Sequence, residues 1–363
     1  MQIPVRFSPR QVTTLLQRFR QVRVLVVGDL MLDEFVWGRV SRISPEAPVP
    51  VVWVQSESVM PGGASNVANN IRALGGQVRI VGLLGTDRWG HLLMEELGSR
   101  GIDTSGVVRS SAWPTIVKTR VIAQRQQVVR VDREQKSALE ASMVERLITS
   151  VREQLSQVDA IVIEDYGKGV ISRKLLEEII PLARAQGRII TVDPKEDHFD
   201  LYHNVTALTP NRAEAGGAVG RELESEQEVQ RAGEELLRRL HSEAVLITMG
   251  EDGMCLFEKS GRRTRIPTVA QEVFDVAGAG DTVIGTFTLA LGSGASMPEA
   301  AVLANHAAGI VVGKVGVAVV TPEELQERIG RKVSSKARPS TGSNHPPPVS
   351  RGSKSSTGRR RVS

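Results

Sequence analysis

The chain has 363 residues, of which 40% are hydrophobic and 24% charged, as in an ordinary globular protein of one large or two modest domains. Its single cysteine, Cys255, excludes an internal disulfide framework. No stretch resembles a signal peptide or a membrane span, so we expect a cytoplasmic protein with no membrane partner. Nine of the 46 Lys and Arg residues lie in 331–363, which has no Asp or Glu, so 1–330 keeps 37 basic against 41 acidic residues. The folded part is therefore mildly acidic although the whole chain has a net charge of +5, which makes nucleic acid an unlikely partner of that part.

The first elements expected are an amphipathic helix within 1–20 and a buried strand at 22–28. Asp29 and Asp33 follow this strand at its C-terminal end. Ligands gather at that end of the strands in open α/β sheets, so both aspartates are candidates for substrate binding. Ordinary turn chemistry is the alternative for each.

Residues 35–54 contain several valines, which favour strands, and also Pro45, Pro48 and Pro50, which interrupt strands. This combination predicts short strands broken by the prolines. We interpret this stretch as a small excursion from the main sheet that forms a lid, a dimer surface or both.

A glycine pair, Gly62 and Gly63, precedes Asn66 and a helix that runs through Leu74. The glycines allow close approach of a ligand, and the amide of Asn66 can both donate to and accept from a sugar hydroxyl. The alternative is a plain turn at a helix start.

A hairpin is expected from 115–123 and 128–132, with Lys118, Arg120 and Arg130 among apolar neighbours. Such charges usually form a solvated strand face. The alternative interpretation is that they bind a substrate phosphate.

Helical and strand patterns alternate through the rest of the chain, which predicts a mostly parallel sheet with helices on both faces. The expected strands are 78–81, 160–164, 188–193, 205–209 and 244–249, with a hairpin at 253–266. The expected helices are one ending at Arg100, those at 142–155, 172–186, 212–218 and 226–240, and those starting near 281, 298 and 322.

Several polar or glycine positions near the predicted strand ends suit a nucleotide. The candidates are Lys195, Asn211, Glu214, Thr248, Gly250, Gly253 and, within a helix, Asn305. Lys195 can neutralise a phosphate, and Asn211 and Glu214, three residues apart on one helical face, can order Mg²⁺ through water. Each candidate also has an ordinary structural explanation. Lys195 can be a surface lysine, and Asn211 can be a helix cap. Gly250 and Gly253 can form a hairpin turn, and Asn305 can line the core.

Residues 274–285 combine a glycine turn, Gly278-Ala279-Gly280, with Asp281 and an apolar helix. The amides at such a helix start attract an anion, whereas the carboxylate repels it. The combination makes sense if Asp281 takes the proton from a hydroxyl that attacks a phosphate.

Residues 62–66, 275–281 and 211–214 resemble the signature motifs of the ribokinase-like (PfkB) carbohydrate kinases. This resemblance covers about 20–330 and implies a three-layer α/β fold with a β-lid. It implies ATP and Mg²⁺ as cofactors, Asp281 as the base and Gly278, Ala279 and Gly280 as an anion hole. It also implies a homodimer formed through the lid.

Within that family, five stretches resemble the heptose 7-phosphate kinases: 41–51 (SRISPEAPVPV), 165–169, 192–195, 208–211 and 304–314. The implied reaction is ATP-dependent phosphorylation of D-glycero-β-D-manno-heptose 7-phosphate at the C1 hydroxyl, in ADP-heptose synthesis. Another sugar or sugar-phosphate kinase, of the fructose-phosphate or ribose type, is the alternative, and a non-catalytic nucleotide or nucleic-acid binder is a more distant one.

Two departures qualify the resemblance. Many relatives have threonine-containing pairs where this chain has Val276-Ala277, and no His-x-Gly-His nucleotidyltransferase motif occurs. We expect another protein to carry out adenylyl transfer. The expected organisation is a kinase domain over 1–330, with lid segments near 35–60 and 115–132, and a basic disordered tail at 331–363.

Overall fold

The computed structural model describes residues 7–124, 126–135, 137–270, 273–314 and 316–335. The last helix, α10, ends at Ser335, so the first residues of the predicted tail belong to it. The expectation of disorder for the remainder, 336–363, lies outside the described residues. None of the helices in the described ranges is long and apolar enough to cross a membrane.

The main sheet has nine strands in the order β13-β12-β11-β10-β9-β8-β1-β4-β5. The strands from β11 to β5 in this order are parallel, and β12 and β13 are antiparallel additions at one edge. The bounds are β1 Arg23–Gly28, β4 Gln77–Gly85, β5 Asp103–Ser110, β8 Ala160–Glu164, β9 Ile189–Asp193, β10 Ala207–Leu208, β11 Ala244–Thr248, β12 Met254–Glu258 and β13 Arg263–Ile266. The predicted mostly parallel sheet is confirmed.

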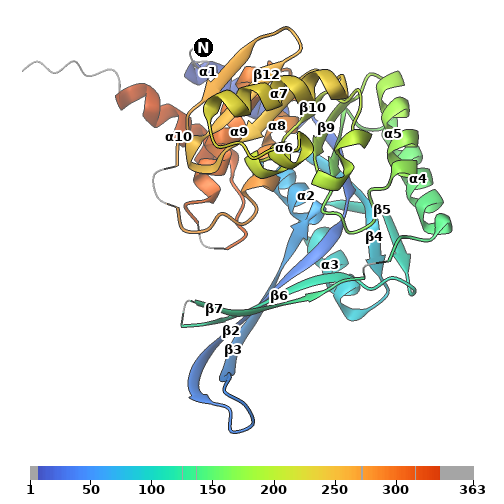
Figure 1. Ribbon diagram of the computed structural model, residues 1–363, viewed down its shortest axis with the longest axis vertical. Helices are drawn as coiled ribbons and strands as arrows, with labels where there is room; N and C mark the ends of the chain where they lie inside the picture. The colour runs from blue at the N-terminus through green and yellow to red at the C-terminus, as the bar shows by residue number, and fades with distance from the viewer. Residues whose placement is uncertain (1–6, 125, 136, 271–272, 315, 336–363) are drawn as a thin grey trace, which may run out of the picture.

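Helices cover both faces of this sheet (Figure 1). Side chains alternate along a strand, so Val24 and Val26 of β1 enter one hydrophobic core and Leu25 and Val27 enter the other. The first core contains α1 Pro9–Phe19, α2 Ala64–Ala73, α3 Arg88–Ser99, α8 Ala279–Gly292, α9 Met297–Val311 and α10 Pro322–Ser335. The second contains α4 Ala141–Leu155, α5 Arg173–Ala185, α6 Arg212–Ala218 and α7 Glu226–Leu240.

A separate four-stranded sheet, the lid, projects from the body as an arm (Figure 1). Its order is β3-β2-β6-β7, with β2 Leu30–Ile43, β3 Pro50–Gly63, β6 Ile116–Ala123 and β7 Gln126–Arg133. The expectation of short strands broken by prolines was wrong, because β2 and β3 run for 14 residues each. Pro45 and Pro48 lie in the connection between them, and Pro50 opens an edge strand, where a missing N–H costs little.

Strand β5 was not predicted. Its sequence, DTSGVVRS, has little apolar alternation, and it pairs only with β4 at the edge of the main sheet. An edge strand needs fewer buried side chains than a central one, so the hydrophobic pattern gives a weak signal there.

Candidate active site

Asp281 lies in the first turn of α8, with only 4% of its surface exposed. Its Oδ2 accepts a hydrogen bond from Nδ2 of Asn66 at 2.6 Å, and its Oδ1 accepts one from the Tyr166 hydroxyl at 2.7 Å. Burial raises the pKa of Asp281, and these two hydrogen bonds oppose the rise. The arrangement is a buried carboxylate held by one donor on each oxygen.

The glycine turn before Asp281 packs closely against Asn66. Gly278 has φ +74°, and a Cβ there would come within 2.7 Å of the Asn66 Nδ2, so the turn requires glycine. The N–H of Ala279 donates to the carbonyl of Val276 at 3.2 Å. The predicted anion hole at Gly278, Ala279 and Gly280 thus lies at a helix N-terminus, with one of its three amides engaged within the turn.

Asn66, which the sequence predicts to bind substrate, donates a hydrogen bond to Asp281, and its role toward substrate stays a prediction. It lies in α2, where Nδ2 of Asn70 donates to its carbonyl at 3.0 Å. The hydroxyl of Thr282 donates to Oδ1 of Asn70 at 2.9 Å, which joins α2 to α8. These contacts fix Asp281 relative to the glycine pair at the start of α2.

Asp29, also predicted to bind substrate, contacts the backbone of a neighbouring loop, and its role toward substrate stays a prediction. It is fully buried, and its carboxylate accepts hydrogen bonds from the backbone amides of Tyr166, Lys168 and Val170 at 3.0–3.1 Å. Burial raises the pKa of Asp29 to about 6. Asp29 therefore anchors the loop that follows β8, and that loop carries Tyr166.

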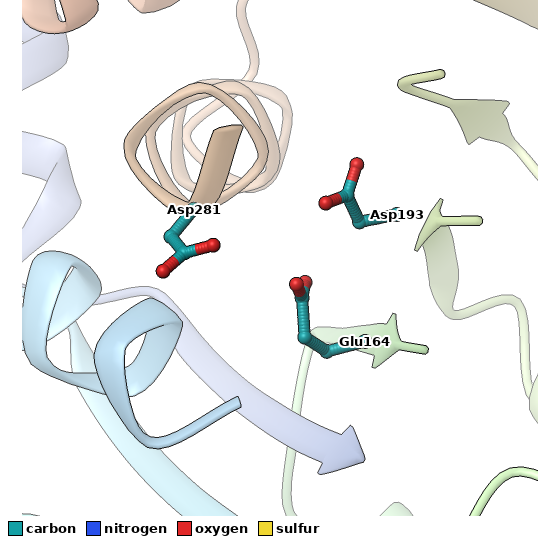
Figure 2. Close-up of side chains that lie close together, drawn as sticks. All are labelled: Glu164, Asp193 and Asp281. Atoms are coloured by element: carbon teal, nitrogen blue, oxygen red, sulfur yellow. The ribbon is translucent and has the colours of Figure 1, made fainter. Parts of the chain in front are cut away.

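Three carboxylates from β8, β9 and α8 converge beside this loop (Figure 2). One oxygen from each of Glu164, Asp193 and Asp281 lies within 4.8 Å of the others. We call this group the acidic triad. Burial and the neighbouring carboxylates raise the pKa of Glu164 well above its ordinary value and that of Asp193 to about 8. Such a triad favours binding of protons or of a cation.

Sequence reasoning missed Glu164 and Tyr166 and treated Asp193 only as the neighbour of Lys195. The available signal was their position, since Glu164 and Asp193 end adjacent parallel strands and occupy the same register. The same rule had selected Asp29, and it applied equally well to these residues.

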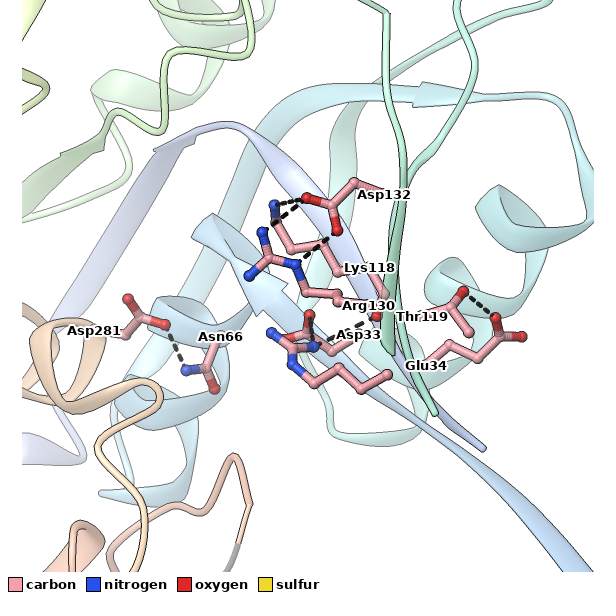
Figure 3. Close-up of polar contacts among 9 residues, drawn as sticks. Asp33, Glu34, Asn66, Lys118, Thr119, Arg130, Asp132 and Asp281 are labelled. Atoms are coloured by element: carbon pink, nitrogen blue, oxygen red, sulfur yellow. Dashed lines mark hydrogen bonds and ion pairs between the residues drawn. The ribbon is translucent and has the colours of Figure 1, made fainter. Parts of the chain in front are cut away.

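Of the three basic residues predicted on the hairpin, Lys118 and Arg120 lie on β6 and Arg130 lies on the edge strand β7. Figure 3 shows Lys118 and Arg130 beside Asp132. Arg120 forms an ion pair with Asp33 at 2.6 Å. Lys118 lies 3.6 Å from Asp132, and Arg130 forms two hydrogen bonds to the same carboxylate at 2.8 and 3.0 Å. We call these five residues the lid charge cluster. Three cations face two carboxylates, so one positive charge remains.

Gly62 lies directly against this cluster. A Cβ at Gly62 would come within 2.8 Å of Oδ2 of Asp33, and Gly63 has φ +52° with its own space filled by Met31 and the carbonyl of Asp29. Both glycines are therefore required by packing, and they bring the lid charge cluster close to the start of α2.

Asn211 and Glu214, the predicted metal ligands, cap α6. Oδ1 of Asn211 accepts from the Glu214 amide at 3.0 Å, and Oε2 of Glu214 accepts from the Asn211 amide at 2.9 Å. This is the helix-cap alternative considered above. Burial raises the pKa of Glu214, which the charge of Lys195 opposes, so Lys195 lies close to this helix start.

The remaining nucleotide candidates surround the ends of β11 and β13. Thr248 pairs with Asn211 in a parallel bridge, and Gly250 and Gly253 have φ +57° and +82° in the turn after β11. Asn305 is nearly buried, and its Nδ2 donates to the carbonyl of Pro267 at 2.9 Å. The Asn305 side chain thus braces the segment after β13.

A family model described as pfkB family carbohydrate kinase matches residues 22–324. The chain is 44% identical over 311 residues to a Bifunctional protein HldE of Desulfatibacillum aliphaticivorans and 46% identical over 321 residues to one of Geobacter metallireducens. These alignments cover 86% and 88% of this chain but 64% and 66% of the relatives, so the chain spans just under two thirds of their length.

Among solved structures, the phosphofructokinase-2 from Escherichia coli in complex with substrates and products matches with a TM-score of 0.72 and 21% identity. The match covers 85% of this chain and 99% of that one, and at this identity it shows the fold alone. The predicted ribokinase-like fold with its lid is therefore confirmed. With a family model spanning most of its length and relatives above 40% identity, this chain belongs to the pfkB family of carbohydrate kinases.

Proposed function

We propose that this kinase transfers the γ-phosphoryl group of ATP to the C1 hydroxyl of D-glycero-β-D-manno-heptose 7-phosphate, in ADP-heptose synthesis. One observation carries the proposal: Asp281, at the N-terminus of α8 beside a glycine turn, lies near a lid that bears a net positive cluster. The heptose-kinase resemblance of residues 41–51 and the four other stretches supports the choice of sugar.

In the proposed reaction, Asp281 accepts the proton of the C1 hydroxyl while the C1 oxygen attacks the γ-phosphorus. The bond between that phosphorus and the β,γ-bridging oxygen breaks, and ADP leaves with its electron pair. Asn66 and Tyr166 each occupy one lone pair of the carboxylate, and each oxygen keeps a second lone pair for the sugar hydroxyl. The base is therefore oriented before substrate arrives.

The substrate's existing phosphate is assigned to the lid charge cluster. A phosphate could replace Asp132 between Lys118 and Arg130, since all three lie on one face of β6 and β7. Arg120 would stay with Asp33, a pair that is largely shielded from water. Arg42, exposed at the far end of β2, is the rival for this phosphate.

ATP is assigned to the opposite side of the base, over α6 and the turn after β11. Oε2 of Glu214 serves the helix cap, which leaves Oε1 for a water of a bound Mg²⁺, and Lys195 is the cation nearby. Mg²⁺ bound with ATP would neutralise charge on the transferring phosphoryl group. The amides of Gly278 and Gly280 would receive the same group at the N-terminus of α8.

We also infer that two copies of the chain associate through their lids. The lid holds seven of the ten large hydrophobic side chains that are exposed in the described residues: Ile43, Val49, Trp53, Val54, Val128, Val129 and Val131. Apolar surface gathered on a projecting sheet is typical of an interface.

A coupled assay for ADP release with a panel of sugars tests the proposed reaction. We expect turnover of heptose 7-phosphate, little turnover of fructose 6-phosphate or ribose, and a loss of about 10³-fold in kcat for Asp281→Asn, as for removal of a general base. Preferred turnover of fructose 6-phosphate would overturn the choice of sugar. Full activity of Asp281→Asn would overturn the assignment of the base.

A further inference from the structure

The loop that follows β8, residues 165–170, is attached to the lid where the first lid strand begins and where the last one ends. Asp29, which immediately precedes β2, accepts hydrogen bonds from three backbone amides of the loop at 3.0–3.1 Å. Glu134, which immediately follows β7, forms an ion pair with Lys168 of the loop at 2.8 Å. The loop is therefore held from two sides by residues at the base of the lid.

Two apolar side chains at the base of the lid also adjoin this loop. A Cβ at Gly169 would lie 3.7 Å from the ring of Trp113 and 3.8 Å from Leu139, which is ordinary van der Waals contact. Trp113 precedes β6, and Leu139 follows β7. The loop thus packs against the segments that lead into and out of the lid, in addition to its polar contacts with Asp29 and Glu134.

The same loop carries Tyr166, whose hydroxyl donates to Oδ1 of Asp281 at 2.7 Å. Tyr166 and Lys168 are two residues apart, and the backbone amides of both donate to Asp29. A displacement of Lys168 would therefore displace Tyr166 as well. A continuous path of contacts runs from Glu134 in the lid, through Lys168 and Tyr166, to Asp281.

The ion pair in this path is largely shielded from water, with 16% of the Glu134 side chain and 23% of the Lys168 side chain exposed. A shielded pair is weakly screened by salt, and removal of one partner leaves the other charge uncompensated. By contrast, Lys174 of α5 pairs with Glu145 of α4, and both of these side chains are about half exposed, so that pair contributes little.

We propose that Glu134 and Lys168 are positioning residues, through which the lid holds Tyr166 on Asp281. This role rests on the proposed function, because it requires Asp281 to be the base. Glu134 and Lys168 act through Tyr166 and not by contact with the reacting atoms. A lid that leaves the body separates Glu134 from Lys168 and frees the loop, so Asp281 is fully oriented only while the lid is in place.

The alternative role for Lys168 is to bind the phosphate of the sugar. Its partner Glu134 lies two residues after Asp132 of the lid charge cluster, so a cation is available near that cluster. The two roles differ in kinetics. Loss of a ligand of the sugar phosphate raises KM for that substrate, whereas loss of a positioning residue lowers kcat.

Steady-state kinetics of Glu134→Gln and Lys168→Gln tests the coupling. We expect kcat to fall about fivefold in each variant, with KM for ATP and for the sugar phosphate near wild type. Glu134→Gln combined with Tyr166→Phe should lose no more activity than Tyr166→Phe alone, because both changes break the same path. The control, Glu145→Gln, makes the same chemical change in the pair between α4 and α5 and should keep the wild-type kcat.

Hydrogen exchange of the full-length chain without ligands tests the coupling independently of turnover. The amides of Tyr166, Lys168 and Val170 should exchange about threefold faster in Glu134→Gln than in the wild type, because the loop opens more often. In Glu145→Gln they should exchange as in the wild type. Unchanged exchange of the strands of the main sheet shows that each variant is folded.

A wild-type kcat in Glu134→Gln, or equal exchange of the loop in this variant and the wild type, would overturn the proposal. A double variant whose loss equals the product of the two single losses would also overturn it, because Glu134 would then act by a separate route. A raised KM for the sugar phosphate in Lys168→Gln, with kcat unchanged, would make Lys168 a phosphate ligand instead. Faster exchange of the loop in a protein that phosphorylates no sugar would support the link between lid and loop and overturn the proposed function.

Discussion

The hydroxyl of Tyr166 donates a hydrogen bond to Oδ1 of Asp281 across 2.7 Å, linking the loop after β8 to the first turn of α8. The loop is in turn fixed by Asp29, whose carboxylate accepts from three of its backbone amides. Burial and the nearby charge of Asp281 raise the pKa of Tyr166 well above its ordinary value, so the phenol keeps its proton and remains a donor. Asp281, the proposed base, is thus held through Tyr166 by a loop that Asp29 anchors at the end of β1.

Replacing Tyr166 with Phe should lower kcat/KM at neutral pH about tenfold, the effect of losing one hydrogen bond to a charged group. The hydrogen bond favours the ionised form of Asp281, so its loss should raise the pKa of the base. The acidic limb of the pH profile of kcat/KM should therefore move to higher pH. Steady-state kinetics across the acidic range measures both effects.

Tyr202→Phe is the control for this prediction. Tyr202 is also buried, and its hydroxyl donates to Asp165 at 2.6 Å and not to Asp281. The variant should keep the wild-type acidic limb. If both variants moved the limb equally, the shift would come from a general disturbance of the loop, and the role given to Tyr166 would be wrong.

Replacing Arg130 with Ala should raise KM for heptose 7-phosphate about tenfold and leave KM for ATP unchanged, since a charged hydrogen-bond partner of the sugar phosphate is lost. Steady-state kinetics with each substrate varied separately makes the measurement. Arg42→Ala, at the rival position, should leave both constants near wild type. A larger effect at Arg42 than at Arg130 would move the phosphate to the far end of β2.

The sequence was sufficient to predict the main sheet apart from β5, because apolar runs at strand spacing and helix start signals agree along the chain. Ser225 with Glu228 and Ser296 with Glu299 form the capping boxes that their spacing predicts. It also placed Asp281 beside a glycine turn at a helix start. These features depend on neighbours within a few residues, which a single sequence contains.

What the sequence could not provide was the direction in which each polar side chain turns. Asp29 and Glu164 both belong to strand ends, yet Asp29 turns toward three backbone amides and Glu164 toward two other carboxylates. Asn66 turns toward Asp281, 215 positions away in the chain. These choices depend on partners that only the tertiary fold brings close, so position at a sheet edge selects candidates without assigning their roles.

Asp29→Asn should remove the part of the pH dependence of the free energy of unfolding that comes from titration of Asp29. Burial raises the pKa of Asp29 from 3.8 to about 6, so between these values the folded chain binds more protons than the unfolded chain. The contribution of Asp29 to the free energy of unfolding therefore falls as pH rises from about 4 to about 6 and is constant above that. Urea unfolding at several pH values should show a shallower fall for the variant than for the wild type.

The variant also exchanges an acceptor for an amide that can serve fewer of the three backbone donors, so it should be less stable than the wild type at neutral pH. Equal slopes for the two proteins across this pH window would show that Asp29 does not titrate there. The other buried carboxylates are present in both proteins, so the difference between the two slopes isolates Asp29.

Trp53→Glu should separate the proposed dimer into monomers. Trp53 lies on the edge strand β3 with 70% of its surface exposed, the largest exposed side chain of the lid. Burying a charge in place of an aromatic ring at an interface is strongly unfavourable. Sedimentation velocity should give a dimer for the wild type and a monomer for the variant at the same concentration.

Phe274→Glu makes the same change at a side chain that is 65% exposed outside the lid, and it should remain dimeric. A monomeric wild type, or a Trp53→Glu protein that stays dimeric, would refute association through the lid.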